Sequence, residues 1–211
     1  MVRDKSRPVP ERRTARSGTT QDRDAHDEEP GGPEPGSEEA ARLICLRLLT
    51  SGPRTRSQLA TALRKRRVPD EVADSVLGRF AEVGLIDDAA FARAWVESRH
   101  HGRGLARKVL AAELRQRGVS DREVRSAVDL LRPQDELATA QQLVARRVAA
   151  SRGKPMPVRA RQLMGMLARK GYPPGLAAQV VREALEQDQA DGGRGTDLAW
   201  ISEDGSGDEW S

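Results

Sequence analysis

An internal repeat of about 50 residues, present three times, constrains the fold of this chain more than any other feature of its sequence. At an offset of 104 residues, apolar and proline positions of the first copy fall on positions of the same character in the third. The matched pairs are Leu59 with Leu163, Leu63 with Leu167, Val68 with Tyr172, Pro69 with Pro173, Val72 with Leu176, Val76 with Val180 and Leu77 with Val181. The middle copy matches the first at an offset of 51 through Leu110, Leu114, Val119 and Ser120, and one inserted residue brings in Val124 and Val128. The sequence therefore predicts a tandem array of repeats.

Apolar residues within each copy recur at three- and four-residue spacing, which predicts helices and no strands. Each copy is typical of a helix, a loop, a second helix, a tight turn and a third helix. We therefore expect an all-α protein of three tandem three-helix repeats in an elongated, curved array. The predicted repeats cover residues 38–84, 85–132 and 133–187.

The middle copy shows the pattern in most detail. Asp87 and Asp88 predict the start of a helix that runs to about Arg99, with Phe91 and Trp95 on its buried face, and a polar loop follows over residues 100–104. The second helix is expected over about 105–117, with Gly118 as its left-handed C-cap and Ser120 capping the third helix. Gly171 takes the same place as Gly118 in the third copy, whereas Arg67 stands there in the first.

The two ends of the chain differ from its centre in composition and charge. Residues 1–37 and 188–211 contain little that could be buried, and we expect both tails to be disordered. The net charges of residues 1–37, 38–187 and 188–211 are −1, +11 and −6, which sum to the chain's +4. A repeat region with a charge of +11 favours a polyanionic partner.

Basic residues concentrate on the predicted second helices and their flanks, which would form a stripe if these helices shared one surface. The candidate binding residues are Arg64, Lys65, Arg66, Arg103, Arg107, Lys108, Arg115, Arg117, Arg159, Arg161, Arg169 and Lys170.

No pattern in the sequence indicates an enzyme, a cofactor site or a metal site. The carboxylate pairs open predicted helices, the three histidines lack companion ligands, and Gly102-Arg103-Gly104 lacks the spacing of a phosphate-binding loop. Cys45, the one cysteine, lies in an apolar run and is expected to be buried. No apolar run is long enough for a membrane span or a signal peptide, so we expect a cytoplasmic protein.

One segment of the second copy carries a resemblance to a known family. The run from Leu85 to Arg99 (LIDDAAFARAWVESR), followed by Leu110, Glu113, Leu114, Arg117, Gly118 and Val119, is similar to the central signature of the RecX family. The resemblance covers about 150 residues and includes the three-helix repeats. It implies a monomeric regulator in DNA repair, recombination and the SOS response. Such a protein lies in the groove of the RecA filament on single-stranded DNA and reduces ATP hydrolysis, strand exchange and co-protease activity.

Two alternative functions stay open on the sequence. Residues 55–86 imitate a helix-turn-helix transcription regulator, although the helix that would read DNA is acidic and no hairpin wing is indicated after Ile86. The chain could also be a helical scaffold that binds only protein. The basic stripe is the feature that favours proximity to DNA.

Overall fold

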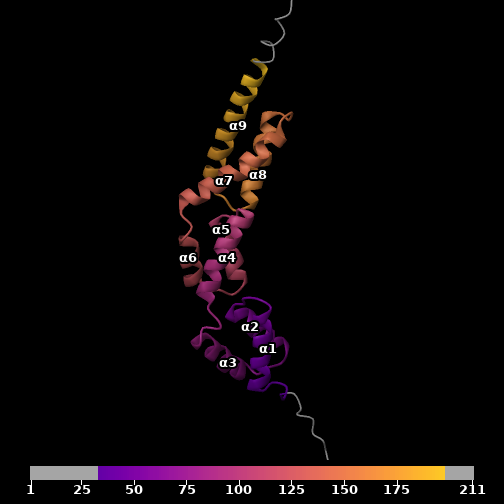
Figure 1. The fold of residues 1–211 in the computed structure, drawn as a ribbon, viewed down its shortest axis with the longest axis vertical. Helices are drawn as coiled ribbons and strands as arrows, with labels where there is room; N and C mark the ends of the chain where they lie inside the picture. The colour runs from indigo at the N-terminus through magenta and orange to yellow at the C-terminus, as the bar shows by residue number, and fades with distance from the viewer. Residues whose placement is uncertain (1–32, 198–211) are drawn as a thin grey trace, which may run out of the picture. The chain divides into compact units, whose positions relative to one another are not determined.

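The computed structural model describes residues 33–197, and the side chains of residues 33–192 (Figure 1). Within residues 33–197 the chain forms nine α-helices, one 3-10 helix and no strand, so the all-α prediction is confirmed. None of the helices in this range is both long and apolar enough to cross a membrane.

The helices fall into three successive three-helix units, as predicted. Unit 1 contains α1 (Glu38–Thr50), α2 (Arg56–Lys65) and α3 (Asp70–Glu82). Unit 2 contains α4 (Asp88–Arg103), α5 (Arg107–Gln116) and α6 (Asp121–Asp129). Unit 3 contains α7 (Pro133–Val148), the 3-10 helix η1 (Ala149–Ser151), α8 (Met156–Arg169) and α9 (Pro174–Asp197).

Each unit has its own hydrophobic core, built largely from the positions that define the repeat. Leu59 and Leu63 are fully buried in unit 1, Leu110 and Leu114 in unit 2, and Leu167 in unit 3. These leucines lie on the second helix of each unit, so the second helix supplies the apolar face on which the other two pack.

Side-chain caps set the starts of α4 and α6, as the sequence predicts. Asp87 accepts a hydrogen bond from the Ala90 amide at 2.7 Å and so caps α4. Ser120 forms a reciprocal capping box with Glu123 at the start of α6. Cys45 is buried as expected, and this burial raises the pKa of its thiol.

The prediction of a polar loop over residues 100–104 was wrong, because α4 continues to Arg103 and ends at Gly104 with φ 61°. His100 is only 3% exposed. Its Nδ1 donates to the Leu105 carbonyl and its Nε2 accepts from the Thr139 hydroxyl, both at 2.9 Å. Partners from outside α4 thus satisfy both ring nitrogens and allow a polar side chain to face inward. The described residues contain no cluster of His, Cys, Asp or Glu that could hold a metal ion.

The last helix also extends further than the sequence indicates. The predicted start of the C-terminal tail at residue 188 lies inside α9, which continues through Gly192 and Gly193 to Asp197. Asp188 is 8% exposed, and it accepts hydrogen bonds from Arg152 and Arg159. This tie gives the extended helix a tertiary anchor, which composition alone does not reveal. Residues 1–32 and 198–211, which make up most of the two predicted tails, lie outside the described residues.

Candidate polyanion-binding surface

The three second helices abut head to tail through two similar junctions. At the first junction, Thr55 caps α2 and its hydroxyl donates to the Arg117 carbonyl at the end of α5, at 2.6 Å. Asp88 of α4 accepts from the Arg56 amide at 2.9 Å, and burial there raises the pKa of Asp88.

The second junction repeats this arrangement one unit further along the chain. The Ala106 amide, at the start of α5, donates to the Lys170 carbonyl at the end of α8, at 2.9 Å. Glu136 of α7 accepts from the Arg107 amide at 2.9 Å. The helices α8, α5 and α2 therefore form one series in which each C-terminus meets the N-terminus of the next, an electrostatically favourable order for helix dipoles.

Glycine is required at each junction for two reasons. Gly118 and Gly171 have φ values of 77° and 89°, which favour glycine. A Cβ at Gly118 would lie 2.2 Å from Ser57 Cβ, and one at Gly171 would lie 2.7 Å from Val109 Cγ2. The predicted left-handed caps are thus confirmed, and they are also the places where successive units touch.

Eight of the predicted binding residues are exposed. Lys108 and Arg115 lie on α5, and Arg161 and Arg169 lie on α8. The others are at or beside helix C-termini: Arg64, Lys65, Arg66 and Arg103. Arg115 also donates to Asp121 at 2.7 Å, which lowers the pKa of that carboxyl.

Two predicted binding residues, one buried and one half-buried, are tied to neighbouring helices, and we remove them from the candidate surface. Arg159 is 7% exposed and donates to Ser151, to the Val148 carbonyl and to Asp188. Arg107 donates through Nε to the Leu131 carbonyl at 2.8 Å, and its guanidinium lies 3.7 Å from Glu136. Both arginines stabilise packing between helices instead of facing a partner.

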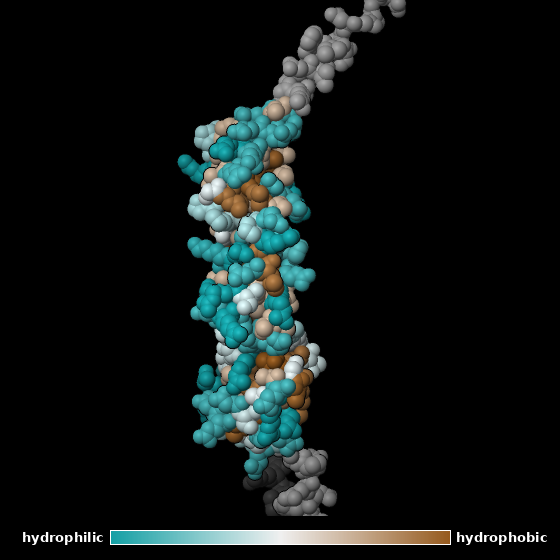
Figure 2. Space-filling model, turned by 90° about the vertical axis from the view of Figure 1, so that its left-hand side faces the viewer, coloured by the Kyte–Doolittle hydropathy of each residue, from teal (hydrophilic) through white to brown (hydrophobic). Residues whose placement is uncertain are grey.

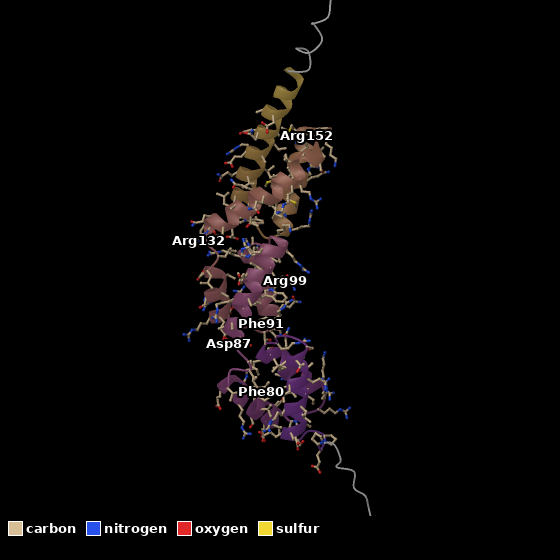
Figure 3. All side chains as sticks on the ribbon, viewed as in Figure 1. Phe80, Asp87, Phe91, Arg99, Arg132 and Arg152 are labelled. Carbon is tan, nitrogen blue, oxygen red and sulfur yellow. The ribbon has the colours of Figure 1, made fainter. Side chains whose placement is uncertain are left out.

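The last two predicted residues, Arg117 and Lys170, are half-buried at the junctions. The Arg117 guanidinium stacks on the Trp95 ring at 3.6 Å from its centre, and Arg99 stacks on the same ring at 4.1 Å. Trp95 also stacks on Phe91, with ring centres 5.8 Å apart, and donates to Glu113 at 2.8 Å. Phe91 and Arg99 are labelled along α4 in Figure 3. Phe91 and Trp95 pack against the core of unit 2, which agrees with their predicted inward face.

Two basic residues outside the predicted set also belong to this surface, Arg99 on α4 and Arg146 on α7. Both lie on first helices, which sequence reasoning treated as sources of core residues. The last turn of α7 contains Arg146 and Arg147, and this enrichment is the sequence signal that could have found Arg146. On the face drawn in Figure 2, hydrophilic side chains surround separate hydrophobic patches, so that face shows no continuous apolar strip.

Comparisons with known proteins agree with this architecture. Residues 41–80 match the family model described as RecX, first three-helix domain, and residues 87–128 match RecX, second three-helix domain. These ranges fall within units 1 and 2.

Similar proteins cover most of the chain. Regulatory protein RecX of Thermobifida fusca (strain YX) is 68% identical over 146 residues, which are 69% of this chain and 79% of that protein. Regulatory protein RecX of Streptomyces coelicolor is 58% identical over 163 residues, which are 77% of this chain and 87% of that protein.

A solved structure of RecX from Lactobacillus salivarius superposes with a TM-score of 0.65 at 16% identity, over 70% of this chain and 96% of that one. This likeness shows a shared fold, and the sequence identities above show common descent. The chain belongs to the RecX family of regulatory proteins.

Proposed function

We propose that this protein regulates the RecA recombinase by binding the RecA filament on single-stranded DNA, which lowers ATP hydrolysis, strand exchange and co-protease activity. Membership of the RecX family supports RecA as the partner. The observation that carries the proposal is the head-to-tail series of second helices, which presents exposed basic residues in each of the three units.

A repeated basic surface suits a repeated, negatively charged partner. A filament offers DNA phosphates and acidic protein groups at regular intervals, so contacts from several units can form on one partner. Once one unit is bound, the next unit meets its site at a high effective concentration. Weak contacts in each unit can therefore add up to stable binding.

The test is the single-stranded-DNA-dependent ATPase rate of the cognate RecA, measured as this protein is titrated well below RecA stoichiometry. We expect hydrolysis to fall at a low ratio, because a filament-bound regulator acts on many RecA subunits. Simple competition for DNA would require far more protein. An unchanged rate at equimolar protein would contradict the proposal.

The helix-turn-helix alternative is less well supported by the described residues. Its recognition helix would be α3, whose first turn carries Asp70 and Glu71 and whose Asp74 is also exposed. These carboxylates would repel DNA phosphates. A transcription regulator should also dimerise and select one duplex sequence, and binding assays with duplex DNA would detect that selection.

A further inference from the structure

A pocket of about 360 Å³ lies where units 2 and 3 meet, between the end of α4, α7 and the C-terminal turn of α8. Four basic side chains line it, from His101, Arg103, Arg146 and Lys170, and its described lining contains no acidic residue. Arg103 and Arg146 are exposed, and neither forms an ion pair with any residue in the described part of the chain. Their charges are therefore available to a ligand.

The backbone of the pocket is held in place by contacts from unit 3. Gly104 adopts the left-handed conformation, which favours glycine, and a Cβ there would lie 2.8 Å from Leu143 Cδ1, so any other residue would also require Leu143 to move. The Tyr172 hydroxyl donates to the Gly104 carbonyl at 3.1 Å, and Lys170 Nζ donates to the Arg103 carbonyl at 2.5 Å. The basic groups thus surround a fixed loop.

Free carbonyl oxygens at a helix C-terminus normally repel anions, and several carbonyls at the end of α4 accept hydrogen bonds here. Besides the Arg103 and Gly104 carbonyls, the His100 carbonyl accepts from the Gly104 amide at 2.8 Å. The Leu105 carbonyl accepts from His100 Nδ1 at 2.9 Å. These paired carbonyls oppose an anion less than free carbonyls would, and the guanidinium groups of Arg103 and Arg146 lie in the same lining.

The chemistry of the lining indicates a phosphate group. Arginine binds phosphate through paired N–H donors and lysine through a compact charge, and Thr139 and Gln142 add neutral hydrogen-bonding groups to the wall. The pocket has no Trp, Tyr or Phe in its lining, whereas protein partners usually anchor on such residues. This composition favours a nucleic acid backbone over an acidic protein face.

We propose that the pocket formed by His101, Arg103, Arg146 and Lys170 binds a backbone phosphate of single-stranded DNA. This inference rests on the proposed function, which places the protein on a DNA-containing filament. It adds a defined phosphate site to that function. It also assigns a binding role to Arg146 and His101, outside the stripe of second helices.

Adjacent arginines on α7 provide a matched test, because Arg146 lines the pocket and Arg147 does not. Binding of a fluorescently labelled oligothymidylate to the full chain, without RecA, is measured by anisotropy over a range of salt concentrations. We expect Arg146→Gln to weaken binding and to reduce the slope of log affinity against log salt by about 0.7, the contribution of one phosphate contact on a single strand. Arg147→Gln should leave the slope unchanged.

Equal effects of Arg146→Gln and Arg147→Gln would overturn the proposed phosphate site, because they would show that oligothymidylate binding responds to net charge alone. A competition with inorganic phosphate, at constant ionic strength, separates the sources of the phosphate group. If Arg146→Gln abolished competition by inorganic phosphate but left the affinity for oligothymidylate unchanged, the assignment of the pocket to a DNA phosphate would be wrong. Circular dichroism and urea unfolding of both variants show whether the fold is retained.

The ATPase titration separates this inference from the proposed function. If the wild-type protein inhibits RecA while Arg146→Gln binds the oligothymidylate normally, the pocket assignment fails and the function stands. If Arg146→Gln loses the phosphate contact but the wild-type protein leaves RecA unaffected, the pocket stands and the function fails.

Discussion

Two residues at the same place in their units, Gly118 and Arg67, show how position in the array changes what a residue must do. Both have positive φ values, 77° and 60°. Gly118 packs against Ser57 of the preceding unit. Arg67 follows the C-cap of the second helix of unit 1, and its side chain is exposed. An L side chain can be tolerated at Arg67 because no second helix docks on it.

Gly118→Ala should destabilise the protein by about 1–3 kcal/mol, because alanine is strained at this φ and its Cβ would collide with Ser57. Arg67→Gly is the matched change in the opposite direction. It should stabilise the protein by less than about 1 kcal/mol, because the relief of backbone strain is partly offset by the larger conformational entropy that glycine loses on folding. Urea unfolding measures both changes in the free energy of unfolding, provided that the m-value is the same in all variants. A Gly118→Ala variant as stable as the wild type would contradict the close packing at this junction.

At the scale of the element, second helices depend on a neighbouring unit where they meet at the two junctions. Thr55 has no exposed surface. Its Oγ1 accepts from the Gln58 amide at 3.2 Å and donates to the Arg117 carbonyl at 2.6 Å. One hydroxyl therefore caps α2 and joins it to α5.

Thr55→Val, which keeps the shape but removes the hydroxyl, should cost about 2–4 kcal/mol, the sum of a lost cap and a buried carbonyl without its donor. Thr55→Ser keeps the hydroxyl and should cost less than half as much. The comparison is made by chemical unfolding monitored by circular dichroism. Similar losses in the two variants would mean that the methyl group, and not the hydroxyl, stabilises the junction.

The extension of α9 depends on another long-range tie. Arg152 and Arg159 both donate to Asp188, and they hold the pKa of that carboxyl below its usual range. Since the folded-state pKa is depressed, the stabilisation by Asp188 is complete above the unfolded pKa of about 4. It is lost as pH falls through the folded value.

Asp188→Asn should therefore destabilise the protein at neutral pH, and the difference from wild type should shrink as the pH is lowered below about 4. Thermal unfolding of both proteins across pH measures this difference. Hydrogen exchange at neutral pH should also show faster exchange in α9 after residue 188 in the variant. A stability difference that stayed constant with pH would rule out an ionised Asp188 as the source.

At the scale of the whole molecule, the proposed partner surface depends on where positive charge lies and not only on how much there is. Arg115 and Arg169 are exposed on second helices of units 2 and 3. Arg122 and Arg182 are exposed on third helices of the same units. The two pairs permit identical changes of net charge on different helices.

Reversal of Arg115 and Arg169 to Glu should weaken inhibition of the RecA ATPase, because these side chains belong to the proposed binding surface. The same reversal at Arg122 and Arg182 should have a much smaller effect at moderate salt, where charges beyond about 10 Å are screened. The circular dichroism spectra of both variants should remain those of a helical protein. If both double variants lost inhibition equally, the effect would come from the overall charge of the protein and not from the position of the charges on the second helices.

The spacing of residues along the chain is enough to specify the three helical units, their cores and several of their caps. These features depend on interactions between residues three or four positions apart, and the spacing of Leu110 and Leu114 or the position of Gly118 shows them directly. The same local logic was wrong for residues 100–103, because the burial of His100 depends on Thr139 in the next unit.

Which basic residues are free to bind depends on contacts between distant segments of the chain. Arg159 and Arg161 are both basic residues of one helix, yet Arg159 is buried against Asp188, which lies 29 residues later, and Arg161 is exposed. The phosphate pocket likewise joins α4, α7 and the end of α8, so its basic residues come from three segments of the chain. Charge and helical period are local properties, whereas the availability of a charge depends on partners that folding brings from distant segments.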